Sequence, residues 1–185
     1  MKYLTSSLAL LVLVGIITAV VRLTSVPAAT PIHFLPVTSM QLSSTAFEDN
    51  GMIPAQYTCD GENTSPPLVI EDVPADAGSL ALVVHDPDAP AGDWAHWLVW
   101  NIPPDTSRIG AGALPERAVQ GITDFRVAAW GGPCPPNGEH RYIFTVYALD
   151  RSLDLPAKSR KADLERALEG NVVGTAQLVG RYSRS

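Results

Sequence analysis

The sequence is poor in charged residues and in cysteine, and only one segment has helical periodicity. Of its 185 residues, 17% are charged and two are cysteines, whereas 16 are prolines and 14 are glycines. Proline and glycine both disfavour helix interiors, so this composition speaks against a helical bundle and favours short strands joined by turns. The length suits one ordinary domain and is short for two. We therefore expect a single, mainly β domain.

The sequence also lacks the common motifs of metal and nucleophile chemistry. It contains no HExxH, no CxxC and no GxSxG, which are spacings typical of zinc sites and serine nucleophiles. Two enzymatic alternatives stay open. His96, His140 and Asp86 could hold a catalytic metal ion, and Cys134 could be a nucleophile if its thiol were free. We expect neither, and predict a protein that is not an enzyme and has no cofactor or metal.

Basic residues are outnumbered by acidic ones. The chain has 13 Lys and Arg against 19 Asp and Glu, a formal net charge of −6. Residues 1–28 contain Lys2 and Arg22 but no acidic residue, so without them 11 basic residues face 19 acidic ones and the net charge is −8. An acidic surface of this size disfavours nucleic acid and anionic membrane surfaces as partners.

Long apolar runs are confined to the N-terminus. Lys2 precedes an almost unbroken apolar run, Leu8–Val21, and the small residues Val26 and Ala28 follow it. This is the layout of a signal peptide cleaved after Ala28. The alternative is an uncleaved membrane anchor, because Tyr3–Val21 is just long enough to span a bilayer. In both cases we expect an exported domain, which is periplasmic, secreted or anchored to the membrane.

The exported part contains a linker, a domain and both cysteines. Residues 29–42 are rich in Pro, Thr, Ser and Ala, so we expect a linker there and the domain in residues 43–185. Thiols in an oxidising compartment tend to pair, so we expect a disulfide between Cys59 and Cys134, against the alternative of two buried free thiols. The bond would close a long loop and stabilise the fold by roughly a few kcal/mol.

Two proline-containing loops each lead into an aromatic, strand-like run. The apolar run Ser79–Val84 brings the chain to His85-Asp86, where the loop PDAPAGD opens into WAHWLVWN; later, the loop GGPCPPNG opens into EHRYIFTVYALD. Proline restricts its own backbone and that of the residue before it, so both loops should be rigid. Because Ser79–Val84 is apolar on both of its alternating faces, we expect a central strand covered on both sides.

Alternation along a strand predicts which side chains share a face. In the first run, one face should carry Trp94, His96, Leu98 and Trp100, and the other Ala95, Trp97, Val99 and Asn101. In the second run, the side chains that should lie together are His140, Tyr142, Phe144, Val146 and Ala148. In the rest of the chain, residues 105–129 are weakly patterned, and we expect irregular loops with short strands there. A helix is predicted over Arg160–Glu169, with Ser159 as its cap and Gly170 as its stop. A final strand is predicted over Asn171–Tyr182.

If the ends of these strands meet, they form a shallow pocket. It would offer two imidazoles, a phenol and loop amides, which are donors that suit an anionic oxyacid group beside apolar walls. Asp86 would accept a hydrogen bond from a histidine or receive a ligand amine. The alternative is that His96 and His140 are structural, hydrogen-bonded residues. Asp88 and Asp93 are interpreted as loop builders that cap their own turns.

The same motifs carry a family resemblance. DPDAP followed by WAHWLVWNIP, and then GGPCPPNGEHRYIFTVYALD, resemble the phosphatidylethanolamine-binding protein family, in particular its bacterial Raf-kinase-inhibitor-like branch of the YbhB/YbcL type. The likeness extends over Phe47–Tyr182, through YTCDGENTSPPL and LVGRYSR. It implies a Greek-key β-sandwich with a short C-terminal helix, and an anion pocket lined by Asp86, Pro90, Trp94, His96, Pro136, His140 and Tyr142.

This sequence departs from the family pattern at two places, and the resemblance also implies a function. Relatives usually carry Gly-His where this chain has Gly170-Asn171, and residues 124–130 differ from the usual form at one rim of the pocket. The expected function is non-enzymatic binding of a small anionic ligand, such as a phosphate-like or phospholipid head group. The alternative is inhibition of a protein partner, a protease or a kinase, although export makes a cytoplasmic kinase an unsuitable target.

Overall fold

The fold consists of two β-sheets and one short helix. The computed structural model describes residues 39–184, so the expected signal peptide or anchor lies outside the described residues. The large sheet has six strands in the order β2 (Gly51–Met52), β9 (Val172–Ser183), β8 (Glu139–Leu149), β4 (Ser79–Asp86), β5 (Trp94–Ile102) and β7 (Val119–Gln120). The small sheet has the order β1 (Gln41–Ser43), β3 (Leu68–Glu71) and β6 (Arg108–Ile109).

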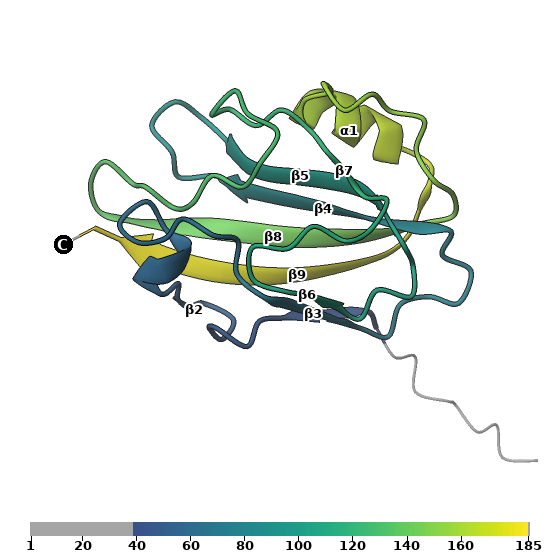
Figure 1. Ribbon diagram of the computed structural model, residues 1–185, viewed down its shortest axis with the longest axis horizontal. Helices are drawn as coiled ribbons and strands as arrows, with labels where there is room; N and C mark the ends of the chain where they lie inside the picture. Colours follow the sequence, from purple (N-terminus) through teal and green to yellow (C-terminus); the bar gives the residue numbers. More distant parts are fainter. Residues whose placement is uncertain (1–38, 185) are drawn as a thin grey trace, which may run out of the picture. The chain divides into compact units, whose positions relative to one another are not determined.

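The large sheet is covered on both faces. In Figure 1 the small sheet lies below it, and α1 (Lys161–Leu168) lies above it beside β5 and β7. One hydrophobic core joins the two sheets, and a second core joins the large sheet to Leu164 and Leu168 of the helix. The expectation of a mainly β fold with a short C-terminal helix is confirmed.

Strand β4 is central, as its sequence predicts. It pairs with β5 on one side and β8 on the other, in both cases antiparallel. Leu80, Leu82 and Val84 are buried in the core between the sheets, while Ala81 and Val83 are buried under the helix. Full burial of each larger side chain stabilises the fold by about 2 kcal/mol relative to exposure.

The predicted alternation holds for β8 but is wrong for β5. Tyr142, Phe144, Val146 and Ala148 all lie in the core between the sheets. On β5, Val84 pairs with Trp97 but His85 pairs with Ala95, so His96 is an extra residue.

This irregularity is a β-bulge, which shifts the strand's alternation by one residue. Trp97 and Val99 therefore pack between the sheets, whereas Leu98 and Trp100 pack under the helix instead of sharing a face with His96. A second shift follows at Asn101, which has a positive φ of 56°.

The ends of two predicted segments also differ from the structure. Residues 40–42 were expected in the linker, yet Met40 and Leu42 are buried and β1 begins at Gln41. The helix begins one residue later than expected. Its N-cap is Arg160 rather than Ser159, and the Asp163 carboxylate accepts a hydrogen bond from the Arg160 backbone N–H at 3.0 Å. Gly170 follows the helix with a φ of 75°, as expected for its stop.

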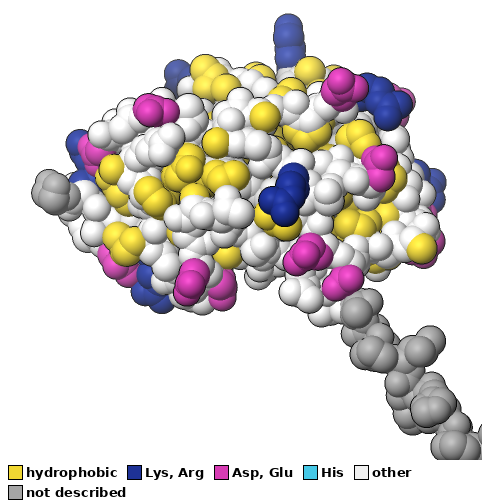
Figure 2. Space-filling view, turned by 60° about the horizontal axis from the view of Figure 1, so that its bottom comes forward, with side chains coloured by type: hydrophobic (Ala, Val, Ile, Leu, Met, Phe, Trp, Pro, Cys, Tyr) yellow, Lys and Arg dark blue, Asp and Glu magenta, His cyan; other side chains and the backbone are white. Residues whose placement is uncertain are grey.

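The described surface is mixed in character. Figure 2 turns the side of the small sheet forward and shows hydrophobic side chains in several separate groups, with most charged side chains nearer the outline. In residues 39–184, no helix combines the length and the apolar character that crossing a membrane requires.

Candidate ligand pocket

Antiparallel pairing brings the two proline-containing loops to the same end of the large sheet. Strand β4 ends where β5 and β8 begin, at the left of Figure 1. Asp86, the last residue of β4, pairs with Trp94, the first residue of β5. On the other side, His85 pairs with Ile143, three residues beyond His140. The predicted meeting of strand ends therefore takes place.

The first loop, residues 87–93, is fixed by ion pairs rather than by turns alone. The Asp88 carboxylate accepts hydrogen bonds from the backbone N–H, Nε and Nη2 of Arg141, at 3.0, 2.8 and 2.7 Å. These hydrogen bonds lower the pKa of Asp88 to about 2. At the other end of the loop, Asp93 contacts His85 and Lys161. Both aspartates thus connect the loop to other elements instead of capping their own turns as expected.

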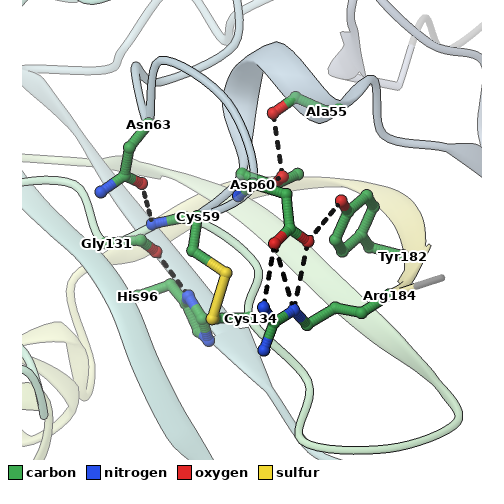
Figure 3. The surroundings of a disulfide bond; sticks show 11 residues. Ala55, Cys59, Asp60, Asn63, His96, Gly131, Cys134, Tyr182 and Arg184 are labelled. Carbon is green, nitrogen blue, oxygen red and sulfur yellow. Dashed lines mark hydrogen bonds and ion pairs between the residues drawn. A yellow bond between two sulfur atoms is a disulfide. The ribbon is translucent and has the colours of Figure 1, made fainter.

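The second loop, residues 131–138, is held by the disulfide and by hydrogen bonds to neighbouring segments. Cys59 and Cys134 are bonded, with 5.5 Å between their Cα atoms. Figure 3 shows this disulfide beside His96 and the Asn63 amide. The Asn63 Oδ1 accepts from the Gly132 N–H at 2.8 Å, and the Cys59 N–H donates to the Pro133 carbonyl at 3.1 Å. The predicted disulfide is present, and it leaves no free thiol for a Cys134 nucleophile.

His96 is buried with one ring nitrogen committed. Its side chain is 3% exposed, and Nδ1 donates to the Gly131 carbonyl. A carbonyl oxygen can only accept, so Nδ1 carries the proton. Burial lowers the pKa of His96, although the Gly131 carbonyl and the Asp86 charge oppose this effect. The ring is therefore neutral at pH 7, and Nε2 is left as an acceptor.

His140 is held by Asp86. Its Nδ1 lies 2.7 Å from the Asp86 Oδ2, and both side chains are almost fully buried. The other carboxylate oxygen accepts from the Asp88 N–H at 2.8 Å. The carboxylate can only accept, so it selects the tautomer with hydrogen on Nδ1. This is the partner that the sequence analysis assigned to Asp86, and it leaves Nε2 of His140 for a ligand.

Tyr142 does not line the cavity, although it was predicted to, and its ring packs against His96. Its side chain is fully buried and its ring lies edge-on to His96, with ring centroids 5.1 Å apart. Burial raises the pKa of Tyr142, and the negative charge of Asp86 raises it further. Its hydroxyl has no hydrogen-bond partner within the described residues.

The cavity between these loops has a volume of about 250 Å³ and mostly apolar walls. Six of the seven predicted residues line it: Asp86, Pro90, Trp94, His96, Pro136 and His140. Ala89, Ala91, Cys134 and Pro135 complete the walls together with Phe125. Phe125 belongs to the segment 124–130 expected at one rim of the pocket, but it was not among the predicted site residues. Phe125 packs edge-on against Trp94 and His96. The sequence around Phe125 has no regular alternation, so it does not indicate which way this aromatic side chain points.

Two further expectations concern metal ions and Asn171. In the part of the chain that the structure describes, no three His, Cys, Asp or Glu side chains are grouped to hold a metal ion. Asn171 donates to the Ala167 carbonyl at 2.9 Å, and its own carbonyl accepts from the Asp150 N–H at the far end of β8. Because β8 has eleven residues, the departure at Asn171 lies about 35 Å of strand away from the pocket.

Known proteins share this fold over nearly the whole described chain. The family model "Phosphatidylethanolamine-binding protein" matches residues 43–183. A UPF0098 protein of Methanothermobacter thermautotrophicus is 51% identical over 150 residues, which is 78% of this chain and 99% of that protein. The UPF0098 protein of Chlamydia muridarum is 44% identical over 150 residues, with the same coverage of the two chains.

Solved structures agree with these sequence matches. A homologue of phosphatidylethanolamine-binding protein from Chlamydia trachomatis has a TM-score of 0.77 at 41% identity, covering 80% of this chain and 99% of that one. YbcL of E. coli, described as a member of the mammalian family, has a TM-score of 0.75 at 34% identity, covering 80% and 100%. Two packed sheets with one short helix thus define a mainly β fold shared with these structures. The chain belongs to the phosphatidylethanolamine-binding protein family.

Proposed function

We propose that the pocket binds a small anionic ligand, such as a phosphate-like or phospholipid head group, without catalysing a reaction on it. One observation carries the proposal: two buried histidines at one cavity have their Nδ1 atoms committed, to Gly131 and to Asp86, so both Nε2 atoms are left for a ligand. Because each Nδ1 already carries a hydrogen, protonation of Nε2 gives a cationic ring, and this ring donates a hydrogen bond to an oxyacid oxygen.

The walls narrow the class of ligand. Asp86 is the one acidic side chain among the lining residues, and none of these residues is Lys or Arg. A bare dianion would therefore find little charge to balance it, whereas an anion with an attached apolar group would also contact Trp94, Phe125 and the prolines. A head group next to an alkyl chain or an aromatic ring fits this description.

Calorimetric titration with phenyl phosphate, phosphoethanolamine and inorganic phosphate tests the proposal. We expect the purified protein to bind phenyl phosphate most tightly and His140→Ala to weaken this binding at least tenfold. Thr175→Ala is the control, because Thr175 is exposed on β9 outside the cavity lining and should leave the affinity unchanged. If no compound binds, or if both variants bind equally well, the proposal fails.

Inhibition of a protein partner is the second candidate. It is favoured by Phe125 and Val127, which are 39% and 48% exposed in the segment that forms one pocket wall. Exposed apolar side chains beside a pocket are common at protein interfaces. Inhibition of a test protease that survives His140→Ala but is lost in a Phe125→Ser, Val127→Ser double variant would support this candidate over the first.

The site of action is also a proposal. A disulfide is typical of proteins in oxidising compartments, and it supports export together with the apolar N-terminal run. Fractionation of the producing cell, with the mature N-terminus determined by sequencing, tests export and distinguishes a cleaved from an anchored form.

A further inference from the structure

The structure contains a second cleft, which is lined by none of the residues that line the first pocket. It has a volume of about 280 Å³, near the lower end of the range for small-ligand sites. The polar and aromatic residues of its lining are Asn63, Thr64, Ser65, Trp97, Gln120 and Trp130. None of its lining residues is charged.

Trp130 forms a rigid aromatic wall of the cleft, backed by the buried Trp97. The Trp130 ring stacks on Phe144 at an interplanar angle of 27°, and it meets Trp97 edge-on at 82°. The indole N–H groups are both engaged inside the protein, Trp130 with the Tyr57 carbonyl at 3.2 Å and Trp97 with the Gln120 Oε1 at 2.7 Å. Trp97 is 2% exposed, so the apolar ring surface that a ligand can reach belongs to the half-buried Trp130.

Two amides on the rim have fixed orientations. The Asn63 Oδ1 accepts from the Gly132 N–H and the Gln120 Oε1 accepts from Trp97, both inside the protein. In Figure 3 the Asn63 nitrogen lies on the side of the amide opposite that hydrogen bond. Across residues 39–184, neither amide NH₂ donates to another protein group, and the hydroxyls of Thr64 and Ser65 form no hydrogen bond.

We infer that this cleft binds a neutral carbohydrate, with one pyranose ring against Trp130. A pyranose ring has an apolar C–H face that packs on an aromatic ring, and a rim of hydroxyls that both donate and accept. Two oriented NH₂ donors and the hydroxyl of the half-buried Thr64 match that rim, whereas Ser65 is only 3% exposed. The absence of charge among the lining residues favours a neutral ligand over the anion assigned to the first pocket.

The test is a titration of the purified protein with glucose, N-acetylglucosamine and their β-1,4-linked dimers. Tryptophan fluorescence and saturation-transfer NMR would report binding, and we expect at least one sugar to change the fluorescence saturably. Asn63→Asp and Gln120→Glu keep the oxygen that accepts the internal hydrogen bond and remove the NH₂ donor. Each should weaken binding about tenfold, equivalent to about 1.4 kcal/mol for the loss of a hydrogen bond.

Two controls separate this cleft from charge effects and from the first pocket. Gln177→Glu adds the same charge at an exposed position of β9 outside the cleft, and His140→Ala alters only the first pocket; both should leave sugar binding unchanged. Circular dichroism should show that all variants remain folded. The inference is overturned if no sugar binds, if Asn63→Asp and Gln120→Glu bind as tightly as the unaltered protein, or if His140→Ala abolishes binding.

Discussion

At the scale of single residues, the partner of each histidine sets its chemistry. His96 donates to a backbone carbonyl and is neutral, whereas His140 donates to a buried carboxylate. From the sequence we expected both imidazoles to be hydrogen-bond donors, whereas in the free protein the His96 ring is neutral and its Nε2 is an acceptor. A neutral Nε2 repels an anionic oxygen, because both are acceptors. Binding of an oxyanion at His96 must therefore be coupled to the uptake of a proton.

This coupling predicts a pH dependence of affinity. The pKa of His96 lies below its ordinary value of 6.5 in the free protein, because the ring is buried. A bound anion favours the protonated ring, so affinity should rise as the pH falls from 7.5 to 5.5. Calorimetry with phenyl phosphate in buffers of different ionisation enthalpy should show proton uptake near pH 7. An affinity that is constant over this range would contradict the role assigned to His96.

At the scale of elements, two rigid loops shape the pocket, and the disulfide holds the second of them. Cys134 lines the cavity, and the same loop carries the Gly131 carbonyl that orients His96. The disulfide closes a loop of 75 residues. In the chain-entropy view, this closure stabilises the fold by about 4 kcal/mol, because it restricts the unfolded chain.

Replacement of both cysteines by serine should therefore lower the urea midpoint and weaken ligand binding. The expected loss of unfolding free energy is about 2–4 kcal/mol, measured by urea denaturation with and without reductant. Reductant should destabilise the unaltered protein and leave the Cys59→Ser, Cys134→Ser variant unchanged. Equal midpoints of the two proteins under oxidising conditions would show that the bond is not a stabilising feature.

The elements also show what the sequence could predict. Regular alternation placed the side chains of β4 and β8 correctly, because these two strands pair with each other without a register shift. The bulge at His96 has no local signature, since it depends on pairing with β4. Phe125 reaches the pocket because Asp124 hydrogen-bonds the backbone of Ala95, a contact between distant segments. The second cleft likewise combines several segments and could not be predicted.

At the scale of the whole molecule, the charges that fix the loops also set its response to acid. Hydrogen bonds from Arg141 hold the pKa of Asp88 at about 2, and those from Lys161 and His85 lower the pKa of Asp93 despite its burial. A carboxylate with a lowered pKa stabilises the fold above its unfolded pKa of about 4, and this contribution is lost at lower pH.

Stability should accordingly fall in two steps as the solution is acidified. Below pH 6.5 the unfolded chain protonates His96 more readily than the folded protein does, so unfolding becomes easier. Between about pH 4 and 2 the contributions of Asp88 and Asp93 are lost, and solvent screening limits the contribution of Asp88 to about 1 kcal/mol or less. Thermal unfolding across this range should show a shallower second step in Asp88→Asn, and an unchanged second step would contradict this assignment.

The most direct test of the pocket is a crystal structure after soaking with phenylarsonate, an oxyanion attached to an apolar ring, whose arsenic can be located by its anomalous scattering. We expect an anomalous peak inside the cavity of Asp86, Trp94 and His140, with arsonate oxygens within hydrogen-bond distance of Nε2 of both His96 and His140. A peak elsewhere, or an empty cavity at saturating phenylarsonate, would contradict the proposed ligand class.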